Sequence, residues 1–272
     1  MSKYETDPND GLPREIVGAW ALDKHWLLAA YVDASRGPRA SLKGEPCFVD
    51  LYCGPGHICT SAGSISSEGG ALVAVRRSLN PTRGVPAPYH QVFIADSEAS
   101  NVDACKQRLS PLDIPVHSTV GDAATTVEEI IGRLPRYGLH LAFLDPYALK
   151  PMPFSVIRAF SKVPKVDLLI HFSTSDLRRN LEHPDQTADN FETVAPGWNK
   201  QPIGYSKREL RHRFFSYWSK LVEGCGYYLA SKPFHVKNSR KSEIYMLTLA
   251  SKNRLGPEIW DSLRPHPQRD LL

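Results

Sequence analysis

The sequence lacks the features that mark several common classes of protein. No apolar run approaches the roughly 18 residues of a membrane-spanning helix, and the polar stretch from Met1 to Asp10 contains no signal-peptide core. The five cysteines include no CxxC pair, which argues against a structural zinc site and a disulfide framework. We therefore expect a cytoplasmic protein with buried, reduced cysteines and no bound metal.

Two motifs of common enzyme classes are also missing. No GxxxxGK[ST] sequence of a P-loop NTPase occurs, and no Gly-x-Ser-x-Gly elbow of a hydrolase. An excess of one charge is absent too, because 33 Lys and Arg face 29 Asp and Glu, giving a formal net charge of +4. This mild balance permits a nucleic-acid partner without arguing for one.

What the sequence does contain is apolar strand-like runs that alternate with helical patterns. The 272 residues, 42% of them hydrophobic, fit one large α/β domain. Alternating strands and helices predict a Rossmann-like fold with a mostly parallel sheet. The expected strands are 47–51, 91–95, 116–120, 139–144 and 166–172, and the expected helices between them are 69–77, 98–108, 125–134 and 154–161.

The ends of the chain are predicted to differ from this pattern. We expect an N-terminal helical extension over residues 1–46, irregular at 1–14 and helical from Ile16 to Val32, and the main domain over 47–272. Within that domain, the proline-rich and glycine-rich stretch 176–204 and the helix after it predict a lid or cap insertion over about 176–222. Two late strand-like runs, 227–234 and 244–250, predict a C-terminal antiparallel hairpin.

A glycine turn follows the first predicted strand. It reads Asp50-Leu51-Tyr52-Cys53-Gly54-Pro55-Gly56, and glycine lets the backbone approach a ligand closely. The GxGxxG fingerprint of dinucleotide-binding proteins does not fit, because Cys59 occupies its last glycine position. This segment is therefore a candidate cofactor site, and a nucleotide-binding oxidoreductase that uses NAD is the less favoured alternative.

Acidic residues end the next three predicted strands, where open α/β sheets bind ligands. Asp96 is placed to accept the ribose hydroxyls of a nucleoside, Asp122 its adenine amine, and Asp145 lies beside the reacting group. A single Asp in such a place is more often a helix cap or a turn former. The whole series favours a nucleoside-type cofactor, with Asp50, Tyr52, Gly54, Gly56, Asp96 and Asp122 holding it.

The segment 50–56 resembles motif I of class I methyltransferases, especially its DLFAGxG form. More specifically, the chain is similar to the three-Cys-motif partner proteins from about Lys24 to Leu263. The matching segments are 50–56, Gly121-Asp122, 144–147, 171–180 and 245–253. The resemblance implies S-adenosylmethionine as cofactor and a radical-type three-Cys-motif partner protein. Family members usually carry Gly-Ser-Pro where this chain has Gly69-Gly70-Ala71.

Asp145-Pro146-Tyr147 resembles the [DNS]PP[YFW] motif of amino-directed N-methyltransferases, with one proline missing. A carboxylate and a backbone carbonyl that accept the two hydrogens of an exocyclic amine localise its lone pair, and an aromatic ring stacks on the base. We therefore predict Asp145, Pro146 and Tyr147 as catalytic residues. The alternative is that Asp145 orients the cofactor and Tyr147 packs under the insertion.

Candidate substrate-binding residues follow the fifth strand. His171 ends this strand, Arg178 and Arg179 could hold a phosphate, and Arg208 and Arg211 lie on a basic, aromatic helix. For His171 the alternative is a purely structural role, and for Arg178 and Arg179 it is the solvated start of a helix. For the basic, aromatic helix the alternative is that it packs on the core through a stripe made by Leu210, Phe214, Tyr217 and Leu221.

Two functions remain open. The first is an S-adenosylmethionine-dependent methyltransferase that acts on an amino group of a nucleobase, in nucleic acid or in a nucleotide-like molecule. The second is a methyltransferase-like accessory protein that binds the cofactor or nucleic acid and assists a radical-type partner.

Overall fold

The computed structural model describes residues 3–61, 63–180, 191–201, 207–237 and 242–263 of the chain. Its main sheet has the strand order β10-β12-β9-β8-β3-β6-β7, and β11 also pairs with β12. These strands are β3 (Cys47–Asp50), β6 (Gln91–Asp96), β7 (Val116–Val120), β8 (His140–Leu144), β9 (Val166–Phe172), β10 (Tyr228–Leu229), β11 (Phe234–Lys237) and β12 (Glu243–Ser251).

Five strands of this sheet are parallel, because β7, β6, β3, β8 and β9 pair in the same direction. β12 runs antiparallel to β9, and both β10 and β11 run antiparallel to β12. The mostly parallel sheet and the C-terminal antiparallel hairpin are confirmed. Because β3 and β9 are buried along their whole length, the sheet must be covered on both faces.

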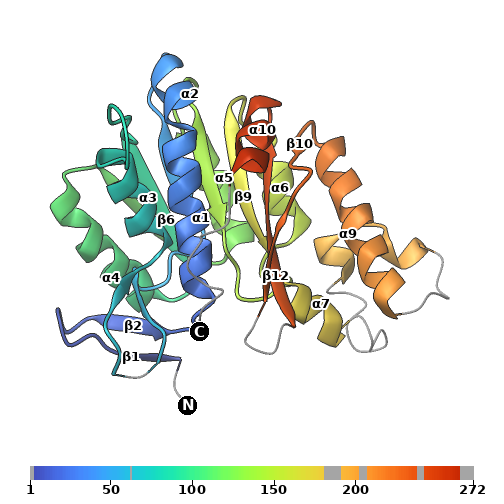
Figure 1. Ribbon diagram of the computed structural model, residues 1–272, viewed down its shortest axis with the longest axis horizontal. Helices are drawn as coiled ribbons and strands as arrows, with labels where there is room; N and C mark the ends of the chain where they lie inside the picture. The colour runs from blue at the N-terminus through green and yellow to red at the C-terminus, as the bar shows by residue number, and fades with distance from the viewer. Residues whose placement is uncertain (1–2, 62, 181–190, 202–206, 238–241, 264–272) are drawn as a thin grey trace.

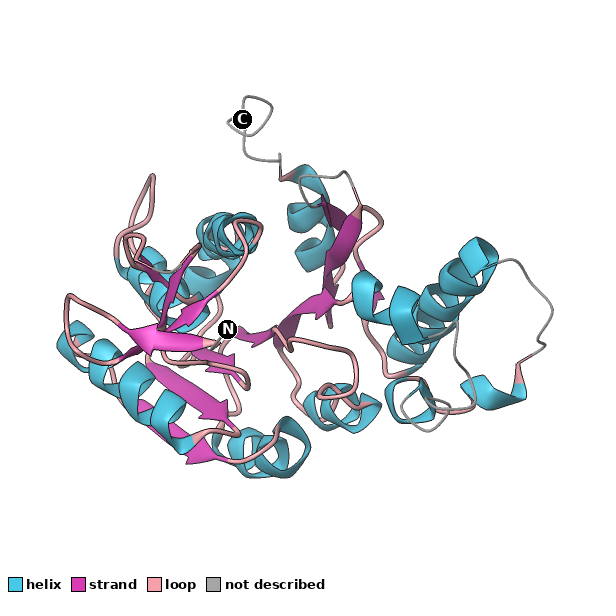
Figure 2. Cartoon of the chain, turned by 90° about the horizontal axis from the view of Figure 1, so that it is seen from below, coloured by secondary structure: helices cyan, strands magenta, loops and turns pink. Residues whose placement is uncertain are grey.

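The helices form two layers, one on each face of the sheet (Figures 1 and 2). One apolar core contains side chains from α1 (Ala21–Ala34), α3 (Gly70–Leu79), α4 (Ala99–Leu109) and α10 (Leu255–Ser262). The other contains side chains from α5 (Ala123–Arg133), α6 (Phe154–Phe160), α7 (Thr174–Asn180) and α9 (Lys207–Gly224). Three further short helices are α2 (Arg36–Ser41), η1 (Ser110–Leu112) and η2 (Trp198–Lys200).

Helix α9 packs on the sheet through an aromatic stripe. Phe214, Trp218 and Val222 are fully buried, and the ring of Trp218 lies 5.1 Å from that of Phe172 on β9. Leu210, Tyr217 and Leu221 pack beside them. The predicted core-facing stripe is thus confirmed. Besides Phe214, its most buried residues are Trp218 and Val222, each one position after the predicted Tyr217 and Leu221. Residues 181–190 and 202–206 of the predicted insertion lie outside the described residues, and its role as a lid stays a prediction.

The N-terminal segment differs from its prediction. Residues 1–14 were expected to be irregular, but β1 (Tyr4–Thr6) and β2 (Pro13–Ile16) form a hairpin, and the first helix begins at Ala21 rather than Ile16. This hairpin belongs to a second sheet of order β1-β2-β4-β5, with β4 (His57–Cys59) and β5 (Ser67–Glu68). Its strands are too short to show a hydrophobic period, so the sequence pattern alone does not reveal them. The second sheet lies beside the glycine turn.

Two expectations from composition can be compared with the described residues. Among them, no helix is both long and apolar enough to cross a membrane. All five cysteines are free thiols, and all except the half-buried Cys225 are buried, as expected for small core residues.

Candidate functional site

A cleft of about 760 Å³ opens at the carboxyl ends of the parallel strands. A smaller cavity of about 50 Å³ adjoins it beneath the glycine turn. Together they are lined by every residue predicted for the cofactor and for methyl transfer, and by His171: Asp50, Tyr52, Gly54, Gly56, Asp96, Asp122, Asp145, Pro146, Tyr147 and His171. The carboxyl ends of β3, β6, β7, β8 and β9 meet at this edge of the sheet, which explains why residues far apart in the sequence share one site.

The glycine turn depends on close backbone contacts. Gly54 and Gly56 have φ of 54° and 86°, in the left-handed region that glycine tolerates best. Gly69 donates its N–H to Gly56 O at 2.7 Å, and a Cβ on Gly69 would lie 3.0 Å from that oxygen. A Cβ on Gly70 would lie 2.6 Å from the ring of Phe143. The glycine pair that starts α3 is therefore needed for its packing against the turn.

Asp50 is a buried carboxyl group at the floor of the small cavity. Its Oδ1 accepts the N–H of Tyr52 at 3.0 Å. Burial, with added repulsion from Asp145 and Asp96, raises the pKa of Asp50 to about 8, although the Tyr52 N–H and Lys24 act against this rise. Among the described residues, no Lys or Arg forms an ion pair with Asp50. A cation bound in this cavity would therefore form the first ion pair with this carboxyl group.

Asp96 holds the turn together from the neighbouring strand. Its Oδ2 accepts the N–H of Gly54 at 3.0 Å, and its Oδ1 accepts the N–H of Glu98 and the side-chain amide of Asn101. These bonds fix the carboxylate at the cleft wall.

Asp122 is the N-cap of α5, since its Oδ1 accepts the N–H of Thr125 at 2.9 Å. The helix predicted over 125–134 therefore begins two residues earlier, at Ala123. The capping alternative therefore holds for one oxygen of Asp122. This residue is exposed on the wall of the cleft.

Asp145 sits between a lysine and a histidine. It forms an ion pair with Lys24 on α1, and its Oδ1 lies 3.5 Å from His171 Nδ1. Burial raises the pKa of Asp145 above its usual value, and the charge of Lys24 limits that rise. Within the described residues, Asp145 Oδ1 is buried and has no hydrogen-bond partner. A buried acceptor without a donor is costly, so this atom is suited to a ligand N–H.

His171 positions the loop that follows β8. Its Nδ1 lies 2.8 Å from Pro146 O, and the edge of its ring packs on Tyr245 with centroids 4.4 Å apart. Burial and the nearby Lys24 lower the pKa of His171 to about 3, so the ring is neutral and donates its Nδ1 proton to the carbonyl. The carbonyl predicted to accept a substrate hydrogen is therefore already bonded to the protein, and only its second lone pair stays open.

Two tyrosines of the site have different environments. Tyr147 is 77% exposed at the mouth of the cleft, and Lys3 Nζ lies 5.3 Å from the centre of its ring. It does not pack in the core, which leaves its face accessible to a base. Tyr52 lines the cleft, but its hydroxyl donates to Pro151 O at 2.9 Å and so joins the glycine turn to the loop after β8.

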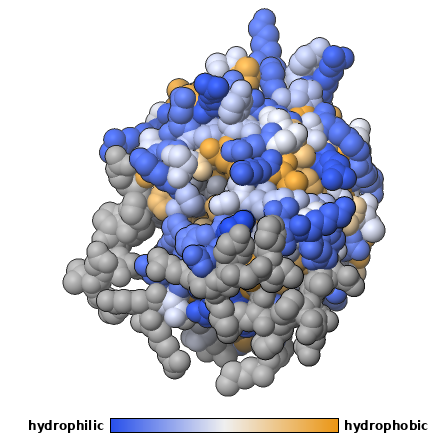
Figure 3. Space-filling view, turned by 90° about the vertical axis from the view of Figure 1, so that its right-hand side faces the viewer, coloured by the Kyte–Doolittle hydropathy of each residue, from blue (hydrophilic) through white to orange (hydrophobic). Residues whose placement is uncertain are grey.

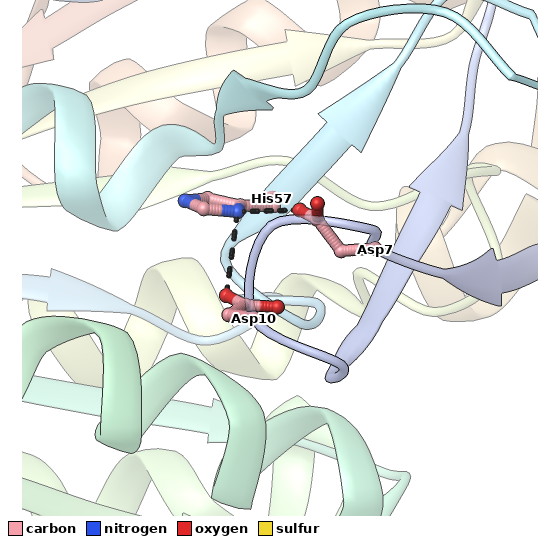
Figure 4. A group of neighbouring side chains, drawn as sticks. All are labelled: Asp7, Asp10 and His57. Carbon is pink, nitrogen blue, oxygen red and sulfur yellow. Dashed lines mark hydrogen bonds and ion pairs between the residues drawn. The ribbon is translucent and has the colours of Figure 1, made fainter.

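The N-terminal hairpin is anchored beside the turn by a polar cluster of Asp7, Asp10 and His57 (Figure 4). His57 Nδ1 lies 2.8 Å from Asp7 and 3.8 Å from Asp10. Arg108 donates to both oxygens of Asp10 at 2.8 Å and to the carbonyls of Pro13 and Pro55 at 2.7 Å. Because an arginine already occupies these carboxylate oxygens, we assign the cluster an anchoring role.

Sequence reasoning missed the contribution of α1 and the hairpin. Lys24 and Lys3 reach the cleft from these elements, and His25 lines the small cavity with a buried Nδ1 that has no partner among the described residues. Burial lowers the pKa of His25 to about 3. A usable signal existed, because His25 falls on the buried helical stripe of Ala21, Leu28 and Val32. A titratable residue on such a stripe is a candidate for a site.

The four predicted arginines do not form one group. Arg178 and Arg211 line a second cleft of about 570 Å³, between α7, α9 and the hairpin strands. Arg179 points to solvent with its side chain 68% exposed and lies 3.7 Å from Asp176, as expected for a solvated helix. The side chain of Arg208 lies outside the described residues.

Comparison with known proteins identifies the fold of the chain. No family model matches the chain, and no curated protein matches its sequence. Among solved structures, Trm1 from Pyrococcus horikoshii, solved with S-adenosyl-L-methionine, is similar with a TM-score of 0.51 at 13% identity. The match covers 91% of this chain and 62% of that one, so the chain spans less than two thirds of Trm1. Protein LPL1258 from Legionella pneumophila is similar with a TM-score of 0.53 at 8% identity, covering 89% of each chain.

The strand order and the match to Trm1 confirm a Rossmann-like class I methyltransferase fold. The identities are low, so this likeness concerns the fold alone. Membership of the three-Cys-motif partner proteins stays a prediction.

Proposed function

We propose that the chain binds S-adenosylmethionine in the cleft and transfers its methyl group to an amino group of a nucleobase, in nucleic acid or in a nucleotide-like molecule. The observation that carries this proposal is the convergence of Asp50, Asp96, Asp122 and Asp145 on one cleft around a glycine turn. A class I methyltransferase fold supports it further.

The residues present fit the cofactor. Asp50, buried and without an ion-pair partner among the described residues, suits its ammonium group. Gly69 and Gly70 line the same cavity at the start of α3. The positive end of the helix dipole favours a carboxylate there, although the N–H of Gly69 already donates to Gly56 O. Asp96 Oδ2, which accepts one hydrogen bond from Gly54 and keeps a second lone pair, suits a ribose hydroxyl, and Asp122 suits the adenine amine. The cofactor supplies an electrophilic methyl group.

The chain's own contribution to the chemistry rests on Asp145. Its unpartnered Oδ1 would accept a hydrogen bond from the substrate amine. This bond localises the nitrogen lone pair and orients it towards the methyl group. When the nitrogen gains the methyl group, it loses a proton to this carboxylate. Pro146 O is held by His171 and can offer only its second lone pair. Tyr147, exposed at the mouth, would stack on the base.

The test is methyl transfer from labelled S-adenosylmethionine to separate pools of RNA, DNA and free nucleotides. We expect label in at least one pool, on an exocyclic nitrogen. Absence of label from all three pools, with cofactor binding confirmed in the same preparation, would contradict the proposal.

Lys24 gives a prediction about pH. Replacing it with methionine should raise the pKa of Asp145 further, because the ammonium lowers that pKa at present. The carboxylate is the active form, so the acid limb of kcat/KM should move to higher pH by about one to three units. Lys24→Arg keeps the charge and should leave the profile close to the original. Identical profiles for Lys24→Met and the unchanged protein would show that this pair does not tune Asp145.

One observation favours the accessory-protein alternative. Lys24 already pairs with Asp145, so the proposed catalytic carboxylate is partly occupied within the protein. Under this alternative the chain would co-purify with a radical-type partner, and the activity of the pair would survive Asp145→Ala.

A further inference from the structure

The second cleft lies on the side of the molecule that carries α9. It is formed by α7, α9, β11 and β12, and its volume is about 570 Å³. Most of the described surface on this side is hydrophilic, with apolar patches between the polar residues (Figure 3). This cleft shares no lining residue with the proposed cofactor site.

Groups that can carry positive charge enter this cleft from three elements. Arg178 comes from α7, Arg211 and His212 come from α9, and His235 comes from β11. Glu243 is the one carboxylate among the described lining residues, and its Oε2 lies 2.9 Å from His235 Nδ1. Two arginines on different helices can donate hydrogen bonds to the oxygens of a phosphate from two directions. A single solvated arginine cannot do this.

The rest of the wall is mostly apolar. Leu177, Phe215, Pro233 and Met246 line the cleft together with one hydroxyl residue, Thr174. Basic groups above an apolar, partly aromatic floor are typical of surfaces that follow a single nucleic-acid strand, because phosphates pair with the cations while sugars and bases lie on the floor.

The second cleft is also next to the first. Along the start of α7, Ser173 and Ser175 line the cofactor cleft, while Thr174 between them lines the second one. Along β12, Ile244 and Tyr245 face the first cleft, and their neighbours Glu243 and Met246 face the second. The two clefts therefore adjoin at the start of α7 and along β12, so a strand that enters the first cleft can continue into the second.

We propose that the second cleft binds the phosphate backbone of a single-stranded nucleic acid beside the base that enters the cofactor cleft. This inference rests on the proposed function for the identity of that base. It assigns Arg178 and Arg211 to strand binding, and it makes a nucleic-acid strand, rather than a free nucleotide, the substrate.

The experiment measures binding of fluorescent single-stranded RNA and DNA oligonucleotides to the full chain by anisotropy, over a range of salt concentrations. The charge-reversal variant Arg178→Glu/Arg211→Glu should bind at least about tenfold more weakly at low salt. Its salt slope should fall by about 0.7 for each phosphate contact that is lost. Arg158→Glu/Lys162→Glu is the matched control, because it makes the same charge change at two exposed residues that line neither cleft. It should stay within about twofold of the unchanged protein.

Two results would overturn the inference. One is an equal loss of affinity in Arg178→Glu/Arg211→Glu and in Arg158→Glu/Lys162→Glu, and the other is no binding of either oligonucleotide by the unchanged protein. Calorimetry with S-adenosylmethionine on the same variants separates this test from the proposed function. If cofactor binding is unchanged and oligonucleotide binding does not depend on Arg178 and Arg211, only the role of the second cleft is refuted. If the unchanged protein does not bind S-adenosylmethionine, the proposed function is refuted.

Discussion

Replacing Asp145 by asparagine is expected to lower methyl transfer by about 10² to 10⁴-fold. The amide is almost the same size and still accepts a hydrogen bond, but it cannot take the proton that the substrate nitrogen releases. It also leaves Lys24 without its carboxylate partner next to the reacting centre. Because Asp145 does not belong to the residues assigned to the cofactor, the affinity for S-adenosylmethionine should change by less than about threefold.

The measurement compares single-turnover rates and cofactor affinity for Asp145→Asn and for Asp103→Asn. Asp103 is an exposed carboxylate on α4 that lines neither cleft, so its variant controls for the loss of one negative charge. Thermal unfolding of both variants checks that each is folded. Full activity of Asp145→Asn would contradict the assignment of Asp145 as the proton acceptor.

Replacing Asp50 by asparagine is expected to weaken S-adenosylmethionine binding by about 100-fold or more, because the buried partner of the cofactor ammonium loses its charge. In the free protein, burial raises the pKa of Asp50 to about 8, so the group is mostly neutral at pH 7. An ammonium bound beside it favours the carboxylate. Binding should therefore release up to one proton, and affinity should increase as the pH rises towards 8.

The same raised pKa affects stability in a defined direction. Between the unfolded value near 3.8 and the folded value near 8, the folded chain holds the Asp50 proton more tightly than the unfolded chain does. The contribution of Asp50 to the free energy of unfolding therefore falls as the pH rises through this window. Asp50→Asn should remove this contribution.

Calorimetry of cofactor binding at pH 6.0 to 7.5, in buffers with different ionisation enthalpies, measures the released proton. This range keeps an α-amino group largely protonated, so that the titration of the cofactor itself contributes little. Asp50→Asn should show weak binding with little proton release. An equal proton release in both proteins would mean that another group titrates.

The cleft could be predicted from the sequence because its signals are local. The glycine turn follows β3, Asp96 ends β6, Asp145 follows β8, and Asp122 comes two residues after the end of β7. The parallel arrangement of the strands then brings their ends to one edge. The alternative role of Asp122 as a helix cap could also be predicted from the sequence, because the hydrogen bond that makes it a cap joins residues only three positions apart.

The parts that sequence reasoning missed depend on contacts between distant segments. The β1–β2 hairpin is held by Arg108 and by pairing with β4 rather than by its own hydrophobic pattern. Lys24 acquires its importance only when α1 packs beside the end of β8. The separation of Arg178 from Arg179 follows from the orientation of a short helix. Composition and spacing do not encode these relations.

The central claim is that this cleft binds S-adenosylmethionine. Its most direct test is a calorimetric titration of the full chain with S-adenosylmethionine and with S-adenosylhomocysteine, repeated on Asp96→Ala. We predict one binding site for both ligands and a marked loss of affinity in the variant, because Asp96 lies at the cleft wall where the ribose is assigned. No binding of either ligand, or equal binding by Asp96→Ala, would contradict the account.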